Sequence, residues 1–421
     1  MLLQFNFENF KSFAQESTLD MMATSIKEHE NDVAYNVYNE RVLKVAAIFG
    51  ANASGKSNVF KAFRFFCRFV LSSNRSMVWL NEKYLSPFAF TSEKKPSFFE
   101  AIFSTKQNIF QYGFKVDQEQ IYEEYLYIRD RKKKKEAYRT LFYRSEQDFE
   151  LAPEFESIKN LLELLEKKTL FLSLMTSFKI EIVQEIKDWF QKVSFMDYAK
   201  GFNNIAITRS RFQTPLMRIL KDDAQKEQLE KFIKAVDVGI DTLDVVTFNK
   251  IELVDEENIE INSDDDETMY EFFSIHANKD TNETFRLPLR EESSGTQKLI
   301  ALYTSLQNVI EQGGILFSDE LDAQLHPLLL RYLINLFHDP KTNPNHAQLI
   351  FTTHDVFTLD KDNFRRDEIW FVDKDERGVS KLYSLAEYKL NDQKKVRNDA
   401  SYGKDYILGK YEAIPDLKPL I

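Results

Sequence analysis

The chain of 421 residues carries 56 Lys and Arg against 67 Asp and Glu, and its net charge of −11 argues against a surface coated for nonspecific nucleic-acid binding. Its single cysteine, Cys67, excludes a disulfide framework and a cysteine cluster for zinc, and its six histidines show no metal-ligand spacing. No apolar stretch approaches the ~18 residues of a membrane span and no secretory leader is recognisable, so we expect a soluble cytoplasmic protein with one large domain plus an insertion or second lobe.

The first predicted functional element is a glycine-rich loop between an apolar strand and a helix. Residues 42–49 form an apolar run of strand length, and residues 58–70 have helical length and apolar spacing. Residues 50–57 between them read Gly-Ala-Asn-Ala-Ser-Gly-Lys-Ser and match the phosphate-binding pattern G-x-x-x-x-G-K-[ST]. In such a loop the backbone N–H groups bind the phosphates, the lysine reaches oxygens of the β- and γ-phosphates, and the serine hydroxyl is a ligand of Mg²⁺. We expect a nucleoside triphosphate to bind through Gly50, Asn52, Ala53, Ser54, Gly55, Lys56, Ser57 and Asn58.

A basic run lies in a predicted hairpin. Residues 120–128 and 138–143 are strand-like, and residues 129–135 between them read Arg-Asp-Arg-Lys-Lys-Lys-Lys. We favour a solvated turn, because charge runs of this kind usually face water. Contact with a DNA backbone is the alternative, since lysine and arginine neutralise phosphates.

Helical patterning dominates the middle of the chain, at residues 150–197 and again at residues 224–236. These segments are too short for a long coiled-coil arm. Strand-like runs follow at residues 242–254 and 269–278. We therefore expect a nucleotide-binding domain in two parts, residues 1–150 and 241–421, with a mostly helical lobe inserted at residues 151–240.

A second helix N-terminus that could bind phosphate follows the lobe. Residues 291–298 read Glu-Glu-Ser-Ser-Gly-Thr-Gln-Lys and open a helix predicted over residues 299–309. Small residues and N–H groups thus gather at the positive end of a helix dipole.

Two apolar strands then end in residues suited to phosphate chemistry. Residues 315–320 end in Asp319 and Glu320, of which one can reach Mg²⁺ and the other can hold the attacking water. Residues 348–355 carry His354 at their end, a side chain that could contact the γ-phosphate or position water.

Two further features have a structural interpretation. His326 is followed by Pro327 and is expected to start a helix. Residues 371–375 form a strand with alternating aspartates, which superficially suits two-metal nuclease chemistry. A hairpin turn is the better interpretation, because Gly378 leads into another strand-like run.

This set of motifs, in this order, resembles the ATP-binding cassette ATPases of the SMC/RecF type, within the SMC/RecF/OLD group of AAA ATPases. The resemblance implies an α/β P-loop NTPase fold with a mixed sheet of the ABC type, and ATP with Mg²⁺ as ligands. It also implies a homodimer or higher homo-oligomer in which the signature of one copy contacts the ATP held by another. Carried over by motif, Gly50, Gly55, Lys56 and Ser57 form the Walker A loop, Ser294, Gly295 and Gln297 the signature, Asp319 the magnesium carboxylate, Glu320 the general base, Asp322 the D-loop and His354 the switch histidine.

The signature departs from the usual family form. It reads Ser-Ser-Gly-Thr-Gln where the family commonly has Leu-Ser-Gly-Gly-Gln, so Thr296 replaces the second glycine. The family's lid glutamine has no clear equivalent, because nothing singles out Gln107 or Gln111.

A closer resemblance links the chain to the defence-associated ATPases related to AbiLi and RloA. Residues 5–13 resemble their first hairpin strand, residues 96–100 and 111–114 their early sheet, and residues 406–415 their tail. The resemblance implies an ATPase of an anti-phage, abortive-infection type of system that regulates a separate effector such as a nuclease. Two alternatives stay open: a RecF-like ATPase that clamps duplex DNA, and a scaffold that binds ATP with hardly any turnover.

Overall fold

A computed structural model describes residues 1–91, 95–129, 137–198, 216–236, 239–249, 268–278, 280–390 and 393–415. The chain divides into two compact units, the first made of Met1–Ala199 with Val309–Ile421 and the second of Lys200–Asn308. These bounds differ from the lobe expected at residues 151–240, since residues 151–198 belong to the first unit. Most of the basic run lies outside the described residues.

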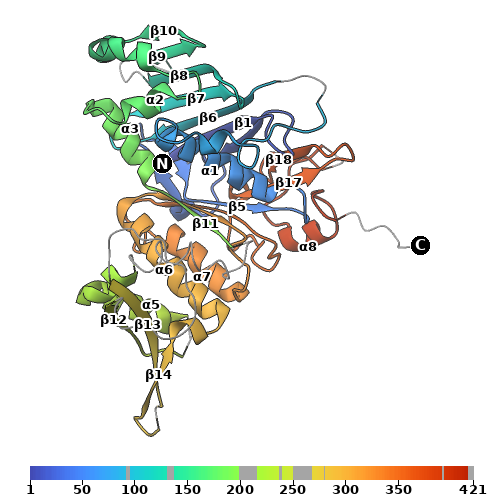
Figure 1. Cartoon of the computed structure of the whole chain (residues 1–421). Coiled ribbons are helices and arrows are strands. Elements are labelled where there is room, and N and C mark those ends of the chain that lie inside the picture. Colours follow the sequence, from blue (N-terminus) through green and yellow to red (C-terminus); the bar gives the residue numbers. More distant parts are fainter. Residues whose placement is uncertain are drawn as a thin grey trace. The chain divides into compact units, whose positions relative to one another are not determined.

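A six-stranded sheet organises the first unit (Figure 1), in the order β11-β15-β16-β5-β17-β18. The strands β11, β15, β16, β5 and β17 run parallel, and β18 is antiparallel to β17. Because parallel strands end at the same edge, the segments that follow them meet there, and we call it the carboxyl edge. The bounds are β5 (Val45–Phe49), β11 (Val193–Asp197), β15 (Ile315–Asp319), β16 (Gln348–Thr352), β17 (Ile369–Lys374) and β18 (Ser380–Ser384).

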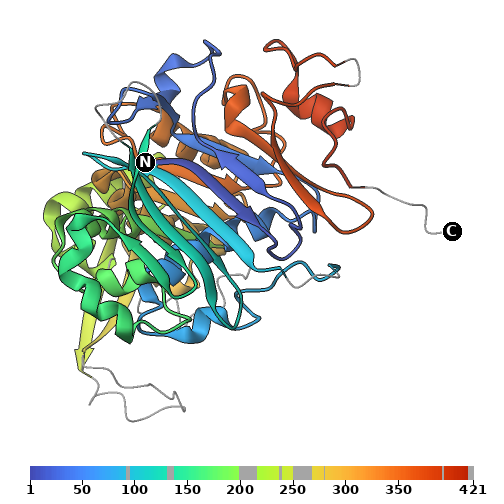
Figure 2. The same cartoon turned by 90° about the horizontal axis from the view of Figure 1, so that it is seen from above.

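The second sheet of this unit is antiparallel and has seven strands in the order β10-β9-β8-β7-β6-β1-β2 (Figure 2). The predicted hairpin is confirmed as β8 and β9, and the strands predicted near Pro96 and Gln111 are β6 and β7. The bounds are β1 (Leu2–Glu8), β2 (Ser17–Asp20), β6 (Ser97–Ser104), β7 (Ile109–Val116), β8 (Ile121–Arg129), β9 (Tyr138–Ser145) and β10 (Asp148–Leu151).

Helix α1 (Lys56–Ser72) packs against both sheets and supplies much of the core. The ring of Phe63 lies 4.9 Å from that of Phe5 on β1 of the seven-stranded sheet. The rings of Phe60 and Phe63 lie 5.4 and 5.9 Å from that of Phe317 on β15 of the six-stranded sheet. Cys67 is buried on this helix, where burial raises the pKa of its thiol, as expected for a packed cysteine. The phosphate-loop helix is therefore held by aromatic contacts with both sheets.

The helical patterning of residues 150–197 is confirmed for most of its length, by the 3-10 helix η3 (Pro153–Leu164), α2 (Phe171–Met175) and α3 (Glu181–Gln191). The helix prediction is wrong for the last residues of this stretch, because residues 193–197 form strand β11. The helical pattern of the preceding residues was extended to residue 197, but residues 193–197 pair in parallel with β15, and such pairing is a long-range contact that the local pattern does not show.

The other elements of the first unit surround these sheets. His326 lies at the N-terminus of α7 and its ring accepts a hydrogen bond from the Leu328 N–H, so its predicted structural role is confirmed. The turn between β17 and β18 confirms the hairpin predicted around Gly378. The bounds are η1 (Glu30–Asp32), β3 (Val33–Tyr35), β4 (Arg41–Leu43), η2 (Met77–Leu80), α7 (Pro327–His338), η6 (Arg366–Glu368) and α8 (Tyr402–Ile407).

The second unit combines helices with a three-stranded antiparallel sheet in the order β12-β13-β14. Its described elements are α5 (Asp223–Ala235), β12 (Thr242–Asn249), β13 (Thr268–Ala277), β14 (Thr284–Pro288), η5 (Leu289–Glu291) and the start of α6 (Ser294–Gln312). Across the described parts of both units, the helices are all too short or too polar to cross a bilayer.

Candidate functional site

The glycine-rich loop joins β5 to α1 at the carboxyl edge. Gly55 has φ 120°, a conformation that side-chain-bearing residues rarely adopt. A Cβ atom on Gly55 would also lie 2.5 Å from Oγ of Ser380 and 2.9 Å from Oγ of Ser12. The second glycine of the motif is therefore required both by backbone conformation and by close approach.

Lys56 is folded against this loop. Its Nζ donates hydrogen bonds to the carbonyl oxygens of Gly50 at 2.7 Å and Ala51 at 2.9 Å, and the residue is only 5% exposed. Burial lowers the pKa of Lys56 to about 8, although the charges of Asp319, Glu320 and Asp322 oppose the shift. The loop thus holds the desolvated ammonium group of Lys56 where it could bind phosphate oxygens.

Asp319, at the end of β15, lies beside two hydroxyl groups. The hydroxyl of Thr352 on β16 donates to its Oδ1 at 2.6 Å, and the hydroxyl of Ser57 on α1 is near enough to lower the pKa of the carboxyl group. Burial raises the pKa of Asp319, and the two hydroxyl hydrogen bonds oppose this shift. A buried carboxylate beside a hydroxyl is a donor set that suits Mg²⁺, so these residues fit the cation expected from the sequence.

Glu320 follows with a left-handed backbone, φ 53°. Its N–H donates to Oγ1 of Thr352 at 2.8 Å, so one threonine fixes both acidic residues. Burial first, and then the negative charges of Asp319 and Asp322, raise the pKa of Glu320. A raised pKa makes this carboxylate a better proton acceptor near neutral pH.

The next two predicted residues meet across the same edge. The backbone N–H of His354 donates to Oδ2 of Asp322 at 3.1 Å. Desolvation and the charge of Lys56 lower the pKa of His354, so its exposed ring is mainly neutral at pH 7 and can donate or accept a hydrogen bond. The structure thus brings Lys56, Asp319, Asp322 and His354 to one edge of the sheet.

The signature residues begin α6 in the second unit. Oγ of Ser293 accepts a hydrogen bond from the N–H of Thr296 at 3.1 Å and lies 2.8 Å from its Oγ1. The side chain of Gln297 turns back and donates to the carbonyl oxygens of Arg290 and Glu292 at 2.9 and 2.8 Å. Thr296 therefore takes part in capping the helix, which gives a local reason for a threonine in place of the usual glycine.

Two serines that the sequence analysis missed support the loop. Oγ of Ser12, in the turn after β1, accepts a hydrogen bond from Asn58 Nδ2 at 2.8 Å and lies 2.8 Å from Oγ of Ser380, to which its own hydroxyl can donate. Ser380 also donates to the carbonyl oxygen of Ser54. No motif marks these serines, because they come from opposite ends of the chain. Gln111 bonds to Glu100 in the seven-stranded sheet, so the lid glutamine stays unplaced.

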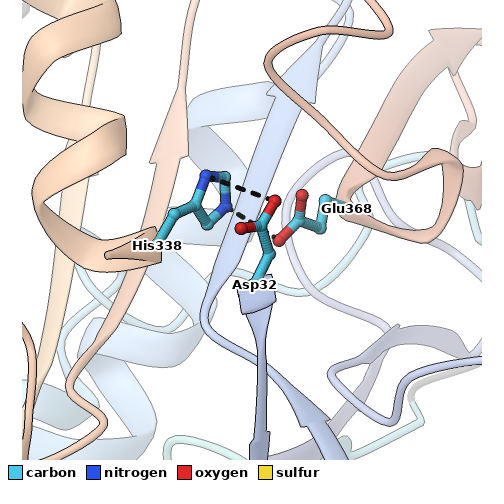
Figure 3. A group of neighbouring side chains, drawn as sticks. All are labelled: Asp32, His338 and Glu368. Atoms are coloured by element: carbon cyan, nitrogen blue, oxygen red, sulfur yellow. Dashed lines mark hydrogen bonds and ion pairs between the residues drawn. The ribbon is translucent and has the colours of Figure 1, made fainter. Parts of the chain in front are cut away.

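A second group of titratable side chains lies at the amino ends of the central strands (Figure 3). Nε2 of His338 is 3.0 Å from Oε1 of Glu368, and its Nδ1 is 3.7 Å from Oδ2 of Asp32. These three buried residues could in principle bind a cation. Both ring nitrogens face carboxylates, however, so the geometry favours a protonated ring over a nitrogen lone pair on a metal. Lys44 adds a further positive charge, since its Nζ donates to the carbonyl oxygen of His338 at 2.7 Å.

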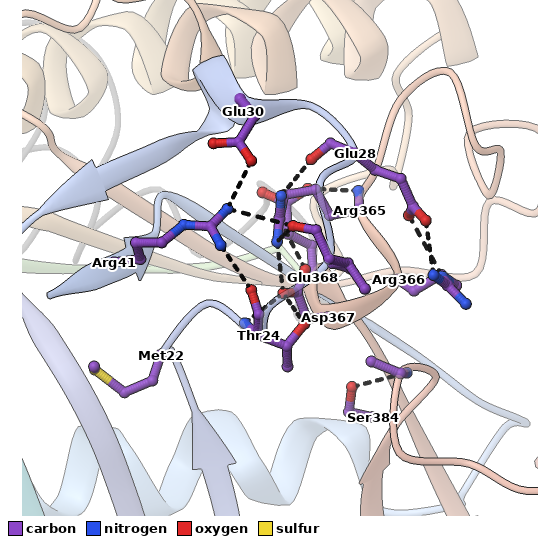
Figure 4. Close-up of polar contacts among 12 residues, drawn as sticks. Met22, Thr24, Glu28, Glu30, Arg41, Arg365, Arg366, Asp367, Glu368 and Ser384 are labelled. Carbon is purple, nitrogen blue, oxygen red and sulfur yellow. Dashed lines mark hydrogen bonds and ion pairs between the residues drawn. The ribbon is translucent and has the colours of Figure 1, made fainter. Parts of the chain in front are cut away.

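Hydrogen bonds extend this cluster toward the N-terminal segment (Figure 4). Arg365 forms a two-pronged pair with Asp367, at 2.9 Å for both contacts, and its N–H donates to Glu368 at 3.0 Å. Thr24 donates to Asp367 through its N–H and its hydroxyl, both at 2.8 Å. These charges are satisfied within the fold, which is typical of a structural network.

Comparisons with known proteins agree with the motif-based interpretation at the level of the family. A family model described as "AAA domain, putative AbiEii toxin, Type IV TA system" matches residues 45–360, about three quarters of the chain. Among solved structures, the SMC head domain from Thermotoga maritima is similar, with 14% identity, coverage of 91% of this chain and 98% of that chain, and a TM-score of 0.38. No curated protein matches the sequence. Because the matched range holds the glycine-rich loop, the strand-end carboxylates and His354, the chain belongs to this AAA-domain family and has the predicted P-loop α/β fold.

Proposed function

We propose that the protein binds Mg-ATP at the carboxyl edge of the six-stranded sheet and hydrolyses it. One observation carries the proposal: a buried ammonium on the glycine loop after β5, and a hydroxyl-bound carboxylate and a second carboxylate of raised pKa after β15, lie at the same end of two parallel strands that flank β16. Structural ion pairs would balance their charges locally, whereas here Lys56 lies near three carboxylates.

The side chains divide the work of hydrolysis. Lys56 exchanges the loop carbonyls for phosphate oxygens, and Asp319 with Ser57 holds the cation. When bound there, Mg²⁺ would offset the charge of the phosphates. Glu320 accepts a proton from the attacking water, and neutral His354 donates a hydrogen bond to the γ-phosphate.

We further propose that ATP joins two copies of the chain. The support is the start of α6, where Ser294 and Gly295 offer a hydroxyl and N–H groups at the positive end of a helix. The motif resemblance assigns such a segment to the ATP of another copy. ATP binding would then stabilise a homodimer or a larger homo-oligomer.

The biological role we propose is that of an anti-phage ATPase in the cytoplasm, which controls a separate effector in abortive infection. Two findings support it: the resemblance to AbiLi- and RloA-related ATPases, and the family description, which names a toxin of Type IV toxin–antitoxin systems. The effector would bind the ATPase directly, and its activity would then depend on whether ATP is bound.

Steady-state hydrolysis and equilibrium binding test the ATPase proposal. We expect Lys56→Ala to lose Mg-ATP binding, and Glu320→Gln to bind Mg-ATP but turn over about 10²-fold more slowly, as a lost general base predicts. Asp148→Asn on β10 is the matched control, because it removes an exposed carboxylate of the other sheet. Undiminished binding by Lys56→Ala would contradict the proposal, and unchanged slow turnover in Glu320→Gln would favour the scaffold alternative.

The defence role needs a test in cells. We would purify Glu320→Gln with ATP from infected and uninfected cells and identify bound proteins and nucleic acid. A stoichiometric protein partner that changes on infection supports the role. Abundant duplex DNA without such a partner, together with salt-sensitive stimulation of turnover by DNA, would instead favour the RecF-like clamp.

A further inference from the structure

Asp197 lies at the nucleotide site although no motif marks it. Strand β11 pairs in parallel with β15, and the register sets Asp197 directly beside Asp319. Residues in register on adjacent parallel strands point to the same face of the sheet, with backbones about 4.8 Å apart. The pairing continues one residue further, where the N–H of Tyr198 donates to the carbonyl oxygen of Asp319 at 3.2 Å. The carboxylate of Asp197 therefore emerges at the same edge as the predicted magnesium ligand.

Helix α1 links the two aspartates on its side of the sheet. Ser57, in its first turn, lies beside the carboxyl group of Asp319, and Arg64 lies two turns later with Nη1 3.8 Å from Oδ2 of Asp197. The negative charge of Asp197 also contributes to the raised pKa values of Asp319 and Glu320, which places it within electrostatic reach of both. Three acidic side chains thus act on one another beside the glycine loop.

The printed contact between Asp197 and Arg64 is a long one. At 3.8 Å it is an ion pair without a hydrogen bond, and the side chain of Arg64 is 32% exposed. Such a pair does not hold the carboxylate in one fixed geometry. A cation beside Asp319 would also attract the negative charge of Asp197, since the two residues are in register on adjacent strands.

We infer that Asp197 is a positioning residue for the magnesium ion of the proposed ATPase, and that it accepts hydrogen bonds from water molecules on the cation that Asp319 and Ser57 would hold. Mg²⁺ gives up its water reluctantly and keeps several water ligands in protein sites. Carboxylates that bind such water orient the ion without touching it, and their loss typically weakens metal binding by about 10–100-fold. The inference rests on the proposed ATP binding and adds a residue to it.

Calorimetry separates this role from a structural one. The dissociation constant of ATP is measured in excess Mg²⁺ and in excess EDTA, and their ratio gives the gain in affinity due to the metal. We expect Asp197→Asn to reduce this gain about 10-fold. The value in EDTA should stay the same or tighten, because a negative charge near the phosphates is gone. Asp148→Asn should change neither value.

Arg64→Gln distinguishes the magnesium role from the ion pair. If Asp197 only holds Arg64, Arg64→Gln will lose as much of the metal-dependent gain as Asp197→Asn, and the inference fails. We expect Arg64→Gln to keep the gain within about 3-fold, since Asp197 remains. Asp197→Glu keeps the charge, should fold even if Asp197→Asn does not, and should retain most of the gain.

Two negative outcomes are distinct. An unaltered protein that binds no ATP in Mg²⁺ would overturn the proposed function and this inference together. An unaltered protein that binds Mg-ATP tightly, with the same metal-dependent gain in Asp197→Asn, would overturn the inference alone.

Discussion

The charged side chains at the two ends of the central parallel strands differ in the partners that they have. At the amino ends, the carboxylates of Asp32 and Glu368 face the two nitrogens of His338, and Lys44 lies close by. At the carboxyl edge, the ammonium of Lys56 is within electrostatic reach of three acidic side chains but hydrogen-bonds to carbonyl oxygens of the loop, and the pKa values of Asp319 and Glu320 are raised. The charged side chains at the amino ends therefore contact one another, whereas those at the carboxyl edge include carboxylates that suit a bound cation.

This difference explains why similar residue types serve different purposes. Buried charges with partners contribute little net stability, but they are costly to break one at a time. Charges left uncompensated cost stability in the empty protein and are retained where a ligand needs them. The comparison therefore predicts that changes at the amino ends affect folding, and changes at the carboxyl edge affect nucleotide binding.

The largest effect should come from His338→Leu. The change leaves Asp32 and Glu368 buried without the ring between them. We therefore expect the free energy of unfolding, measured by urea titration, to fall by about 3 kcal/mol. ATP affinity, measured at a temperature where the variant is folded, should change little.

An exposed ion pair provides the control for this prediction. Lys159 and Glu156 are 64% and 63% exposed, so Lys159→Ala should leave the urea midpoint unchanged. If His338→Leu kept its stability but lost ATP affinity, the two ends would not be separable in the way proposed.

Gly55→Ala should have the next largest effect, at the other end. The φ of 120° and the approach of Ser380 Oγ to 2.5 Å both oppose a side chain, and strain of this kind costs about 1–3 kcal/mol. We expect it to appear as ATP affinity weakened by about 10-fold or more in calorimetry.

Combining Gly55→Ala with Ser380→Ala sharpens that test. Removing the hydroxyl relieves the close contact but not the backbone strain, so affinity should recover only in part. Full recovery would show that the glycine is needed for space alone, and no loss in the single variant would contradict the required conformation.

Sequence patterns could predict the carboxyl edge because its signals are local. Residues 50–57 match a motif, and the strands that end in Asp319 and His354 are short apolar runs followed by polar residues. Each signal can be recognised within about ten residues, and parallel strand ends always meet at one edge. The structure confirms these strands and the fold class.

Other features depend on contacts that no local pattern shows. Residues 193–197 directly follow a helical pattern and were predicted to continue it, whereas their pairing with β15 makes them a strand and brings Asp197 to the site. His338, Asp32 and Glu368 come from three distant segments, so their spacing in the sequence is uninformative. The supporting serines Ser12 and Ser380 were missed for the same reason.

The pH dependence of ATP binding provides a smaller effect at the carboxyl edge. Burial lowers the pKa of Lys56 to about 8, so the free protein loses this charge between about pH 7 and pH 9. Phosphate oxygens favour the charged lysine, so binding takes up a proton in this range. We expect ATP affinity to fall about 10-fold from pH 7 to pH 9. Calorimetry in buffers of different ionisation enthalpy measures the proton uptake, and Lys56→Arg should abolish this pH dependence if it binds.

The smallest effect we expect is a pH dependence of stability at the amino ends. Burial tends to lower the pKa of His338, but the charge and hydrogen bond of Glu368 and the charge of Asp32 outweigh it, so the pKa is raised. Burial raises the pKa of Glu368 as well. The folded state thus binds these protons more tightly than the unfolded state, and the stabilisation is full below the unfolded pKa values and declines as pH rises through the folded ones.

Urea unfolding between about pH 6 and pH 9 can isolate this contribution. We would compare the unaltered protein with the variant that carries both His338→Leu and Glu368→Gln, because it lacks both protons at issue. The stability difference between the two should shrink as pH rises, since only the unaltered protein loses the bound protons. Burial lowers the pKa of Lys44, so its release of a proton acts in the opposite direction, but both proteins keep this lysine. Parallel pH profiles would show that the ring is not the protonated partner of the carboxylates, and they would reopen the cluster as a site for a metal cation.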